Sequence, residues 1–215
     1  MAQRDPAPVP ATPRSKRFAD VVVASLLLLV TAPLSALVGL LVRLRLGRPV
    51  VFTQSRPGLR GRPFEMHKFR SMTNAVDADG SLLQDSARLT PLGRALRVSS
   101  LDELPELYDV VRGQMSLVGP RPLLHRYTPH LTETERRRLD VPPGITGWAQ
   151  VNGRNAASWD ERLAMDVWYV DNWSWRLDLR ILAMTLVRVL VRRGAVADPG
   201  SAMKDLDAER LSQHS

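Results

Sequence analysis

The sequence predicts an α-rich α+β fold: a single membrane-embedded domain with an N-terminal re-entrant helix broken at Pro33, a small β-hairpin and interfacial amphipathic helices. Three observations carry this prediction. Residues 21–42 form an uncharged apolar run, residues 49–69 hold two alternating runs around a glycine-rich turn, and later segments show helical periodicity with capping residues. Among 215 residues 44% are hydrophobic and 24% charged, which is enough apolar material for one buried core.

The chain divides into four segments on this basis. Residues 1–17, rich in proline and alanine, are expected to form a disordered cytosolic tail. Residues 18–42 are the membrane helix, and residues 43–194 are the folded domain that carries the candidate site. Residues 195–215 are expected to be a flexible C-terminal tail.

Cysteine and histidine usage limits which metal sites and nucleophiles the chain can have. The chain has no cysteine, which excludes disulfides, Cys-ligated zinc, iron–sulfur clusters and a cysteine nucleophile. Its four histidines lack close ligand spacing such as an HExxH pair. We therefore expect any metal to be a hard ion with oxygen ligands.

The net charge of +8 suits nucleic acid, an anionic membrane or phosphorylated substrates equally well. Its distribution is more informative. From Arg43 to Met72 the chain has eight basic residues against one acid, Glu65. This basic segment follows directly on the apolar run.

The apolar run allows three interpretations. Its 22 uncharged residues would reach roughly 33 Å as a helix, enough for a straight membrane span. Pro33 divides it into two arms too short to cross alone, and arginines flank both ends although positive charge marks the cytoplasmic side. A helix that enters, breaks and returns fits both facts, and Thr31 and Ser35 could cover the freed carbonyl. A buried soluble helix is the third possibility.

The next elements follow from turn and capping signals. Residues 49–55 and 62–69 predict a β-hairpin. Residues 73–90 are polar and predict a loop. Helices are expected at about 103–112, ended by a glycine, at about 133–140, and from Ser158 to about Asp171, the last two with a Glu three residues after a capping Thr or Ser.

Residues 178–194 predict an amphipathic helix. Asp178, Thr185, Arg188 and Arg192 fall on one side of a helical wheel and aliphatic residues on the other, as in an interfacial helix or a core-packed surface helix. All five tryptophans come after residue 147. They could mark a membrane interface or an ordinary core.

The most informative motif for chemistry is LRVSSLDELPEL at residues 96–107. Asp102 and Glu103 precede Pro105, and proline is tolerated only in the first turn of a helix. A helix N-terminus keeps a carboxylate ionised and also binds phosphate. Asp102 is therefore a candidate nucleophile or Mg²⁺ ligand, although a plain helix cap would have the same sequence.

Several basic residues are candidates for binding phosphate. Lys68 and Arg70 follow the glycine-rich turn, and Lys68 is one of three lysines beside 27 arginines. Arg121 lies between two prolines, which favours a preset guanidinium. Residues 144–155 mix glycines with polar donors as sugar or nucleotide loops do, and plain connecting loops have the same composition. Asp166 lies four residues after Arg162, at the spacing of a surface ion pair.

Taken together, these segments resemble the bacterial sugar transferase family, the monotopic polyprenyl-phosphate phosphoglycosyl transferases. The resemblance covers roughly residues 14–194. The matching segments are Lys16-Arg17-Phe18 with Asp20, the Pro33 break, PVVFTQSRPGLRGRPF at 49–64, KFRSM at 68–72, SLDELPEL at 100–107, MSLVGPRPLL at 115–124, PPGITGWAQVNGRN at 142–155 and the stretch 158–178. Larger members carry an extra N-terminal region, so this chain resembles the catalytic core alone.

The resemblance implies an activity: transfer of a phosphosugar from a nucleotide diphosphosugar, usually a UDP-sugar, to undecaprenyl phosphate, at the cytoplasmic face of the bacterial inner membrane. It implies Asp102 as nucleophile and Glu103 as base or ligand, the two together binding Mg²⁺. Substrate phosphates would be bound by Lys68, Arg70, Arg97 and Arg121, with Arg154 and Asp166 in support.

Two departures from the family pattern concern Ala32 and His67. The residue before the helix-breaking proline is commonly Ser, and the residue before KFRSM is commonly Tyr. The loss of the Ser hydroxyl weakens the prediction of a re-entrant break, whereas we expect little consequence from His67.

Two other functions remain open at this point. The basic segment 43–72 could be a lipid- or nucleic-acid-binding patch of a non-catalytic protein, or the chain could be a membrane scaffold. A binding patch needs no Asp-Glu pair, and the chain has no recognisable DNA-binding motif, so nucleic acid is not an expected partner. The identity of the sugar, the glycan pathway and the oligomeric state stay undetermined.

Overall fold

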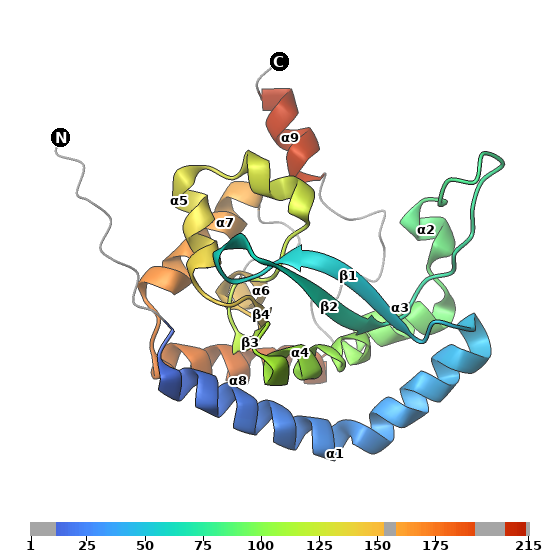
Figure 1. Ribbon diagram of the computed structural model, residues 1–215, viewed down its shortest axis with the longest axis horizontal. Coiled ribbons are helices and arrows are strands. Elements are labelled where there is room, and N and C mark those ends of the chain that lie inside the picture. Colours follow the sequence, from blue (N-terminus) through green and yellow to red (C-terminus); the bar gives the residue numbers. More distant parts are fainter. Residues whose placement is uncertain (1–11, 153–157, 192–204, 214–215) are drawn as a thin grey trace.

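A computed structural model describes residues 12–152, 158–191 and 205–213 (Figure 1). One long helix, α1 (Arg14–Leu46), lies along one side of a globular body built from short helices and two small sheets. The segments that carry the candidate site lie between α1 and the distal C-terminal helix. The prediction of a helix-rich domain with a small hairpin is confirmed.

Helix α1 is longer than the predicted 18–42 and continues through Pro33. Figure 1 shows it bent in its middle, with the convex side away from the body. The expectation of a broken helix therefore needs correction: the proline bends the helix without interrupting it. Thr31 Oγ1 donates to the carbonyl of Leu27 at 2.7 Å, so it does not cover the Leu29 carbonyl that Pro33 leaves without its helical N–H partner.

Both ends of α1 are fixed to the body. At the N-terminal end Lys16 Nζ donates to Asp178 Oδ2 at 2.6 Å, and Arg17 donates to the carbonyls of Val110 and Val111. At the other end Val38 and Val42 are buried and form a hydrophobic cluster with residues of the hairpin and of helix α3 (Pro91–Val98). The arms of α1 thus pack against one body, with the bend between them.

The predicted hairpin is confirmed. Strands β1 (Val51–Pro57) and β2 (Pro63–Phe69) pair antiparallel, with Val51 opposite Phe69 and Pro57 opposite Pro63. The turn η1 (Leu59–Gly61) places Arg60 at φ 55°. His67, the residue where the family commonly has Tyr, has a structural role that we did not expect, because its Nδ1 lies 2.7 Å from Oδ1 of the fully buried Asp109.

Residues 73–90, which were predicted to be a loop, are mostly turns but contain the short helix α2 (Asp85–Arg88). Helix α3 (Pro91–Val98) follows and was not predicted; Thr90 caps it and proline begins it. The predicted helix at 103–112 occurs as a turn η2 (Leu101–Glu103) followed by α4 (Glu106–Arg112). Gly113 ends α4 at φ 86°, as predicted.

A second, parallel sheet joins β3 (Ser116–Val118) to β4 (Gly144–Thr146). Its strands are close enough that a Cβ on Gly119 or Gly144 would collide with backbone. This pairing brings the 119–122 turn to the middle of the body.

The remaining helices follow the predicted caps. Segment 133–140 is α5 (Glu133–Arg136) followed by η4 (Arg137–Asp140), and Thr132 and Glu135 form a capping box. After α6 (Trp148–Asn152), helix α7 (Trp159–Asp171) begins with the capping box of Ser158 and Glu161. Helix α8 (Trp175–Val191) corresponds to the amphipathic helix predicted at 178–194, of which residues 192–194 lie outside the described residues. Trp148 packs on the core, in agreement with one of the two interpretations, and Trp168 and Trp175 are exposed.

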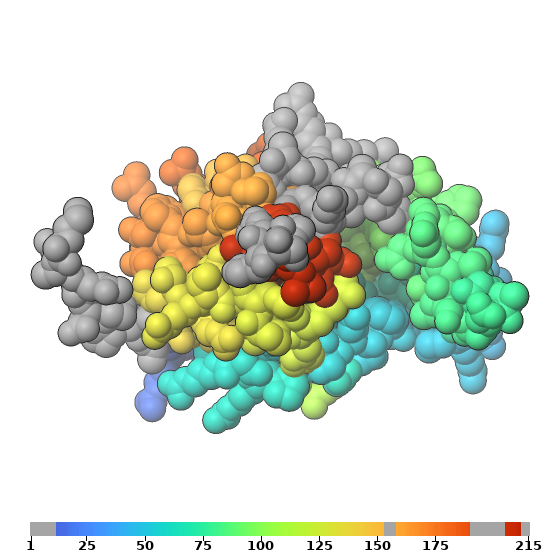
Figure 2. Space-filling view, turned by 90° about the horizontal axis from the view of Figure 1, so that it is seen from above, coloured from blue at the N-terminus to red at the C-terminus, as the bar shows by residue number. Residues whose placement is uncertain are grey.

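The C-terminal segment contains a further helix, α9 (Leu206–Gln213), where we expected a flexible tail. Leu206 is fully buried against Tyr127 of the turn η3 (His125–His130) and against Leu163. Tyr127 and Arg126 both donate to the Asp205 carboxylate. Figure 2 shows α9, in red, lying over the segment around η3 and α5, in yellow.

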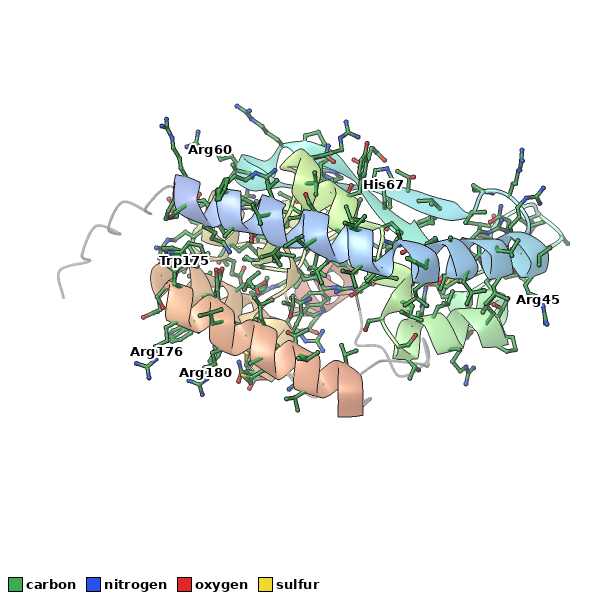
Figure 3. The ribbon with its side chains drawn as sticks, turned by 90° about the horizontal axis from the view of Figure 1, so that it is seen from below. Arg45, Arg60, His67, Trp175, Arg176 and Arg180 are labelled. Carbon is green, nitrogen blue, oxygen red and sulfur yellow. The ribbon has the colours of Figure 1, made fainter. Side chains whose placement is uncertain are left out.

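The face opposite α9 is apolar. In the part of the chain that the structure describes, α1 is the one helix long and apolar enough to cross a membrane, and little of its apolar window is buried. Leu29 and Val30 are about three-quarters exposed. Helix α8 runs beside α1 on this face, and its Leu179 and Leu186 are also exposed (Figure 3).

Candidate active site

Asp102 lies in the turn η2, directly before α4. Ser100, at φ 56°, turns the chain sharply after α3, and Pro105 opens the next helix. The Asp102 side chain is only 7% exposed. The predicted position of this carboxylate at the start of a helix is therefore confirmed, with a 3-10 turn preceding the α-helix.

Glu103 is held by two cations. Lys68 Nζ, from β2, and Arg121 Nη2, from the 119–122 turn, each lie 2.7 Å from Glu103 Oε1. Burial alone would raise the pKa of Glu103, but Arg121 and Lys68, by charge and by hydrogen bonds, lower it to about 2. Glu103 in turn raises the pKa of Arg121. Glu103 is consequently a poor base that fixes two positive groups beside Asp102.

Lys68 also contacts a second carboxylate. Its Nζ lies 3.0 Å from Glu106 Oε1, on the first turn of α4. Burial raises the pKa of Glu106 to about 7, although Lys68 opposes that shift. Lys68 therefore joins two acids of very different pKa.

The Asp102 carboxylate has no comparable partner. Of the residues that the structure describes, none donates a hydrogen bond to it, whereas Glu103 accepts two. Burial and the neighbouring Glu103 raise the pKa of Asp102, while Lys68, Arg121 and Arg97 lower it. Its carboxylate therefore lies without a donor from these residues, next to cations that can bind an anion.

The other predicted basic residues differ in position. Arg97, at the end of α3, donates to Ser71 Oγ at 3.1 Å and is near enough to Asp102 to affect its pKa. Arg70 instead donates to the backbone carbonyls of Met72 and Arg48 and so holds the hairpin base to the chain after α1. Arg154 lies outside the described residues.

Asp166 is buried on α7 and pairs with Arg138 of η4, not with Arg162 as a surface pair would. Arg138 also donates to the carbonyl oxygen of Arg121 at 2.6 Å. Asp166 is therefore connected to the site through Arg138.

Three residues of this region were missed by sequence reasoning: Arg56, Glu106 and Arg138. Arg56 donates to Gln54, and burial together with the nearby Arg121 lowers its pKa to about 10. Its position in the TQSRPG segment was a usable signal. Glu106 and Arg138 had none, because an acid in a first helical turn and one arginine in a run of three both look like solvated surface.

The donor chemistry of the site suits Mg²⁺. Asp102 and Glu103 supply carboxylate oxygens, which this ion prefers, and it usually completes its coordination with water and substrate phosphates. No cluster of three or more metal-ligating side chains occurs in the described ranges. A metal here would depend on ligands from a bound substrate. An open hollow of about 660 Å³ is lined by residues of the α3 region between Leu89 and Ser99, and Asp102 is not among them.

A buried carboxylate beside fixed cations, on a body with a long exposed apolar helix, is typical of enzymes that bind anionic substrates at an apolar surface. The comparison with known families identifies which one. Residues 11–192 match the bacterial sugar transferase family model. The chain belongs to the bacterial sugar transferase family.

Individual relatives support the same family assignment. The chain is 54% identical over 179 residues to an uncharacterized sugar transferase EpsL of Bacillus subtilis, covering 83% of this chain and 89% of the relative. It is 40% identical over 198 residues to the undecaprenyl-phosphate glucose phosphotransferase of Komagataeibacter xylinus, covering 84% of this chain but 36% of that protein. It is 37% identical to the exopolysaccharide production protein ExoY of Sinorhizobium fredii, over 84% of this chain and 88% of the relative.

Proposed function

We propose that the chain transfers a phosphosugar from a UDP-sugar to undecaprenyl phosphate and releases UMP, through a covalent intermediate on Asp102. The product would begin the assembly of an exopolysaccharide, O-antigen or glycoconjugate. The observation that carries the proposal is the Asp102 carboxylate, buried and without a donor, beside the two cations on Glu103. The relatives named as undecaprenyl-phosphate sugar phosphotransferases support the same reaction class.

The reaction has two balanced steps. An Oδ atom of Asp102 attacks the β-phosphorus of the donor; an O–P bond forms while the bond to the bridging oxygen breaks, and UMP leaves with that electron pair. An oxygen of undecaprenyl phosphate then attacks the same phosphorus, and the Asp102 carboxylate leaves. This order lets one site accept a soluble donor and a membrane acceptor in turn.

The surrounding cations make the first step feasible. An ionised Asp102 must approach a diphosphate, so two negative groups repel. Lys68 and Arg121 offset this repulsion, and Arg121 is 46% exposed, so its guanidinium has faces available to substrate. Glu103 keeps both cations beside the reacting carboxylate.

A Mg²⁺ ion fits the same arrangement. Asp102 and Glu103 would hold it together with the donor diphosphate. When bound, it would neutralise phosphate charge and stabilise the charge that moves to the leaving group. Removal of the metal by EDTA is expected to abolish UMP release, and release that persists in EDTA would contradict the metal requirement.

The enzyme is proposed to lie on a membrane surface. Helix α1 would be re-entrant, so that it enters and leaves the membrane on the same side. A straight span would separate the ends of α1 by about 30 Å of hydrocarbon. Lys16 and Val42, near opposite ends, are instead both buried against one body. This geometry supports a helix that enters and leaves on one side, the cytoplasmic side.

Basic side chains surround the apolar face. Figure 3 shows Arg176 and Arg180 pointing outward from α8, away from α1, and Arg45 at the far end of α1. Arginines placed around exposed leucines are typical of a surface that rests on anionic lipid headgroups.

Cysteine labelling tests this topology, because the chain has no cysteine of its own. Single substitutions Ser15→Cys and Arg48→Cys in cells should both react only from the cytoplasm, and Val30→Cys should be protected. Labelling of Ser15→Cys and Arg48→Cys from opposite sides would mean a spanning helix.

The competing function is a basic membrane-associated protein that binds without catalysis. It predicts salt-sensitive lipid binding that does not depend on Asp102. The free buried carboxylate favours an enzyme, because a binding patch gains nothing from an unpaired acid in its centre.

The direct test is UMP release across a panel of UDP-sugars, with undecaprenyl phosphate and Mg²⁺ in detergent or nanodiscs. We expect release with at least one sugar and none in Asp102→Asn. Lipid binding without release from any nucleotide sugar would favour the non-catalytic alternative.

A further inference from the structure

A buried ion pair lies behind the site and has no contact with the reacting carboxylate. Arg138, 2% exposed, donates to Asp166 Oδ2 from Nε at 3.0 Å and from Nη2 at 2.8 Å. Asp166 is 5% exposed. One carboxylate oxygen thus receives both donors, which sets the plane of the Arg138 guanidinium.

The same Arg138 guanidinium also contacts the turn that carries Arg121. Arg138 Nη2 donates to the carbonyl oxygen of Arg121 at 2.6 Å, and Arg121 Nη2 donates to Glu103 Oε1 at 2.7 Å. A continuous series of contacts therefore runs from Asp166 to Arg138, to the Arg121 backbone, and to the acid beside Asp102.

The turn that carries Arg121 depends on outside support. Pro120 and Pro122 have no N–H, so they cannot donate hydrogen bonds that fix the turn. The sheet holds its first part, because Gly119 N donates to the Thr146 carbonyl and Gly144 N donates to the Pro120 carbonyl. The next carbonyl, that of Arg121, is held by Arg138 alone among the described residues.

Stability does not explain this pair well. Desolvation of two buried charges commonly offsets their attraction, so well-packed apolar residues often serve stability equally well. Burial raises the pKa of Asp166 although Arg138 opposes the shift. The contact with the Arg121 carbonyl gives the pair a second role.

We propose that Arg138, oriented by Asp166, is a positioning residue for Arg121: it fixes the carbonyl of the proline-flanked turn so that the guanidinium remains beside Glu103 and the donor phosphates. This inference rests on the proposed function. It assigns Asp166 an effect on transfer without contact to substrate.

The test compares two neighbouring arginines. Arg138→Lys keeps the charge but lacks the planar fork that donates to Asp166 and the Arg121 carbonyl together. Arg137→Lys is the matched control, since Arg137 lies next in the chain and pairs with Asp171 on the same helix. The readout is the single-turnover rate of phosphosugar attachment to the protein by intact mass, together with the thermal unfolding midpoint in detergent.

We expect Arg138→Lys to slow attachment by about 10- to 100-fold, as a misplaced binding group does, and Arg137→Lys to change it by less than about twofold. In an Arg121→Lys background, Arg138→Lys should add less than about twofold. Asp166→Glu should retain more activity than Asp166→Asn, because it keeps the acceptor charge.

Two results would overturn the inference: equal rates for the Arg138→Lys and Arg137→Lys variants, or the same loss from Arg138→Lys with and without Arg121. If the unfolding midpoint of Arg138→Lys falls below the assay temperature, the Asp166 pair of variants decides the question. A wild-type chain that attaches no sugar phosphate from any UDP-sugar would defeat the proposed function itself.

Discussion

Two charge clusters in this protein are built differently. The anchor cluster, which fixes the start of α1, consists of Lys16, Asp20, Ser116, Tyr169 and Asp178; the site cluster consists of Lys68, Asp102, Glu103, Glu106 and Arg121. In the anchor cluster every carboxylate oxygen has a donor. In the site cluster Asp102 has none from the described residues, and one Glu103 oxygen takes two.

The two clusters differ in whether their charged groups have all their hydrogen-bond partners. In the anchor cluster Tyr169 and Trp173 donate to Asp178, and Ser116 donates to Asp20, so the buried charges are satisfied. In the site cluster the pKa of Glu103 falls to about 2 while that of Glu106 rises to about 7. Unequal, incompletely satisfied acids are typical of reactive sites.

The largest expected effect is on activity, from Asp102→Asn. Loss of the nucleophile should reduce UMP release by at least about 1,000-fold. The unfolding midpoint in detergent should not fall, because burial raises the pKa of Asp102 and a neutral group is easier to bury. Equal UMP release by the variant and the wild type would contradict the assignment.

Disruption of the anchor cluster should have the opposite pattern. Lys16→Met leaves Asp178 and Asp20 buried without their cation, at a cost of about 3–5 kcal/mol. Chemical denaturation in detergent measures that loss. The attachment rate per folded molecule should stay within about threefold of the wild type. A fully stable Lys16→Met variant would show that the anchor cluster does not hold α1.

Glu106 gives the site cluster a pH-dependent contribution to stability. Its pKa rises from 4.5 to about 7 on folding, so its protonated form favours the folded state, and that contribution is lost as pH increases from 4.5 through 7. Relative to Glu106→Gln, the wild type should lose more than about 1 kcal/mol of unfolding free energy over that interval. Parallel pH profiles for the two proteins would contradict the shift.

The narrowest change to the anchor cluster, the loss of a single hydrogen bond, is made by Ser116→Ala. Its hydroxyl donates to Asp20 Oδ2 at 2.7 Å, and one lost hydrogen bond to a buried charge costs about 1.5–3 kcal/mol. Denaturant midpoints of the variant and the wild type measure the difference. No change would indicate that water replaces the donor.

The elements predicted from sequence are those with local causes. The hairpin, the capping boxes at Thr132 and Ser158 and the helix end at Gly113 depend on residues within a few positions of one another. The parallel pairing of β3 with β4 was missed because three-residue strands far apart in the chain leave no periodicity. Helix α9 was missed because Leu206 gains its burial only from distant segments.

In the candidate site, too, contacts between segments far apart in the sequence could not be predicted. Asp102 was predictable from its place before Pro105, and the resemblance to a family pointed to Lys68, Arg97 and Arg121. The attachment of Lys68 and Arg121 to one oxygen of Glu103 depends on three segments meeting in space. Arg138 was invisible for the same reason, and Arg70 proved to bind backbone carbonyls near the hairpin base.

The central claim is that Asp102 reacts while Glu103 holds the cations. Its most direct test is peptide mapping by mass spectrometry after the protein is incubated with a UDP-sugar and Mg²⁺, without lipid acceptor. We expect a sugar-phosphate adduct on the peptide that contains Asp102, lost in Asp102→Asn and formed slowly in Glu103→Gln. An adduct that persists in Asp102→Asn, or that maps to another residue, would contradict it.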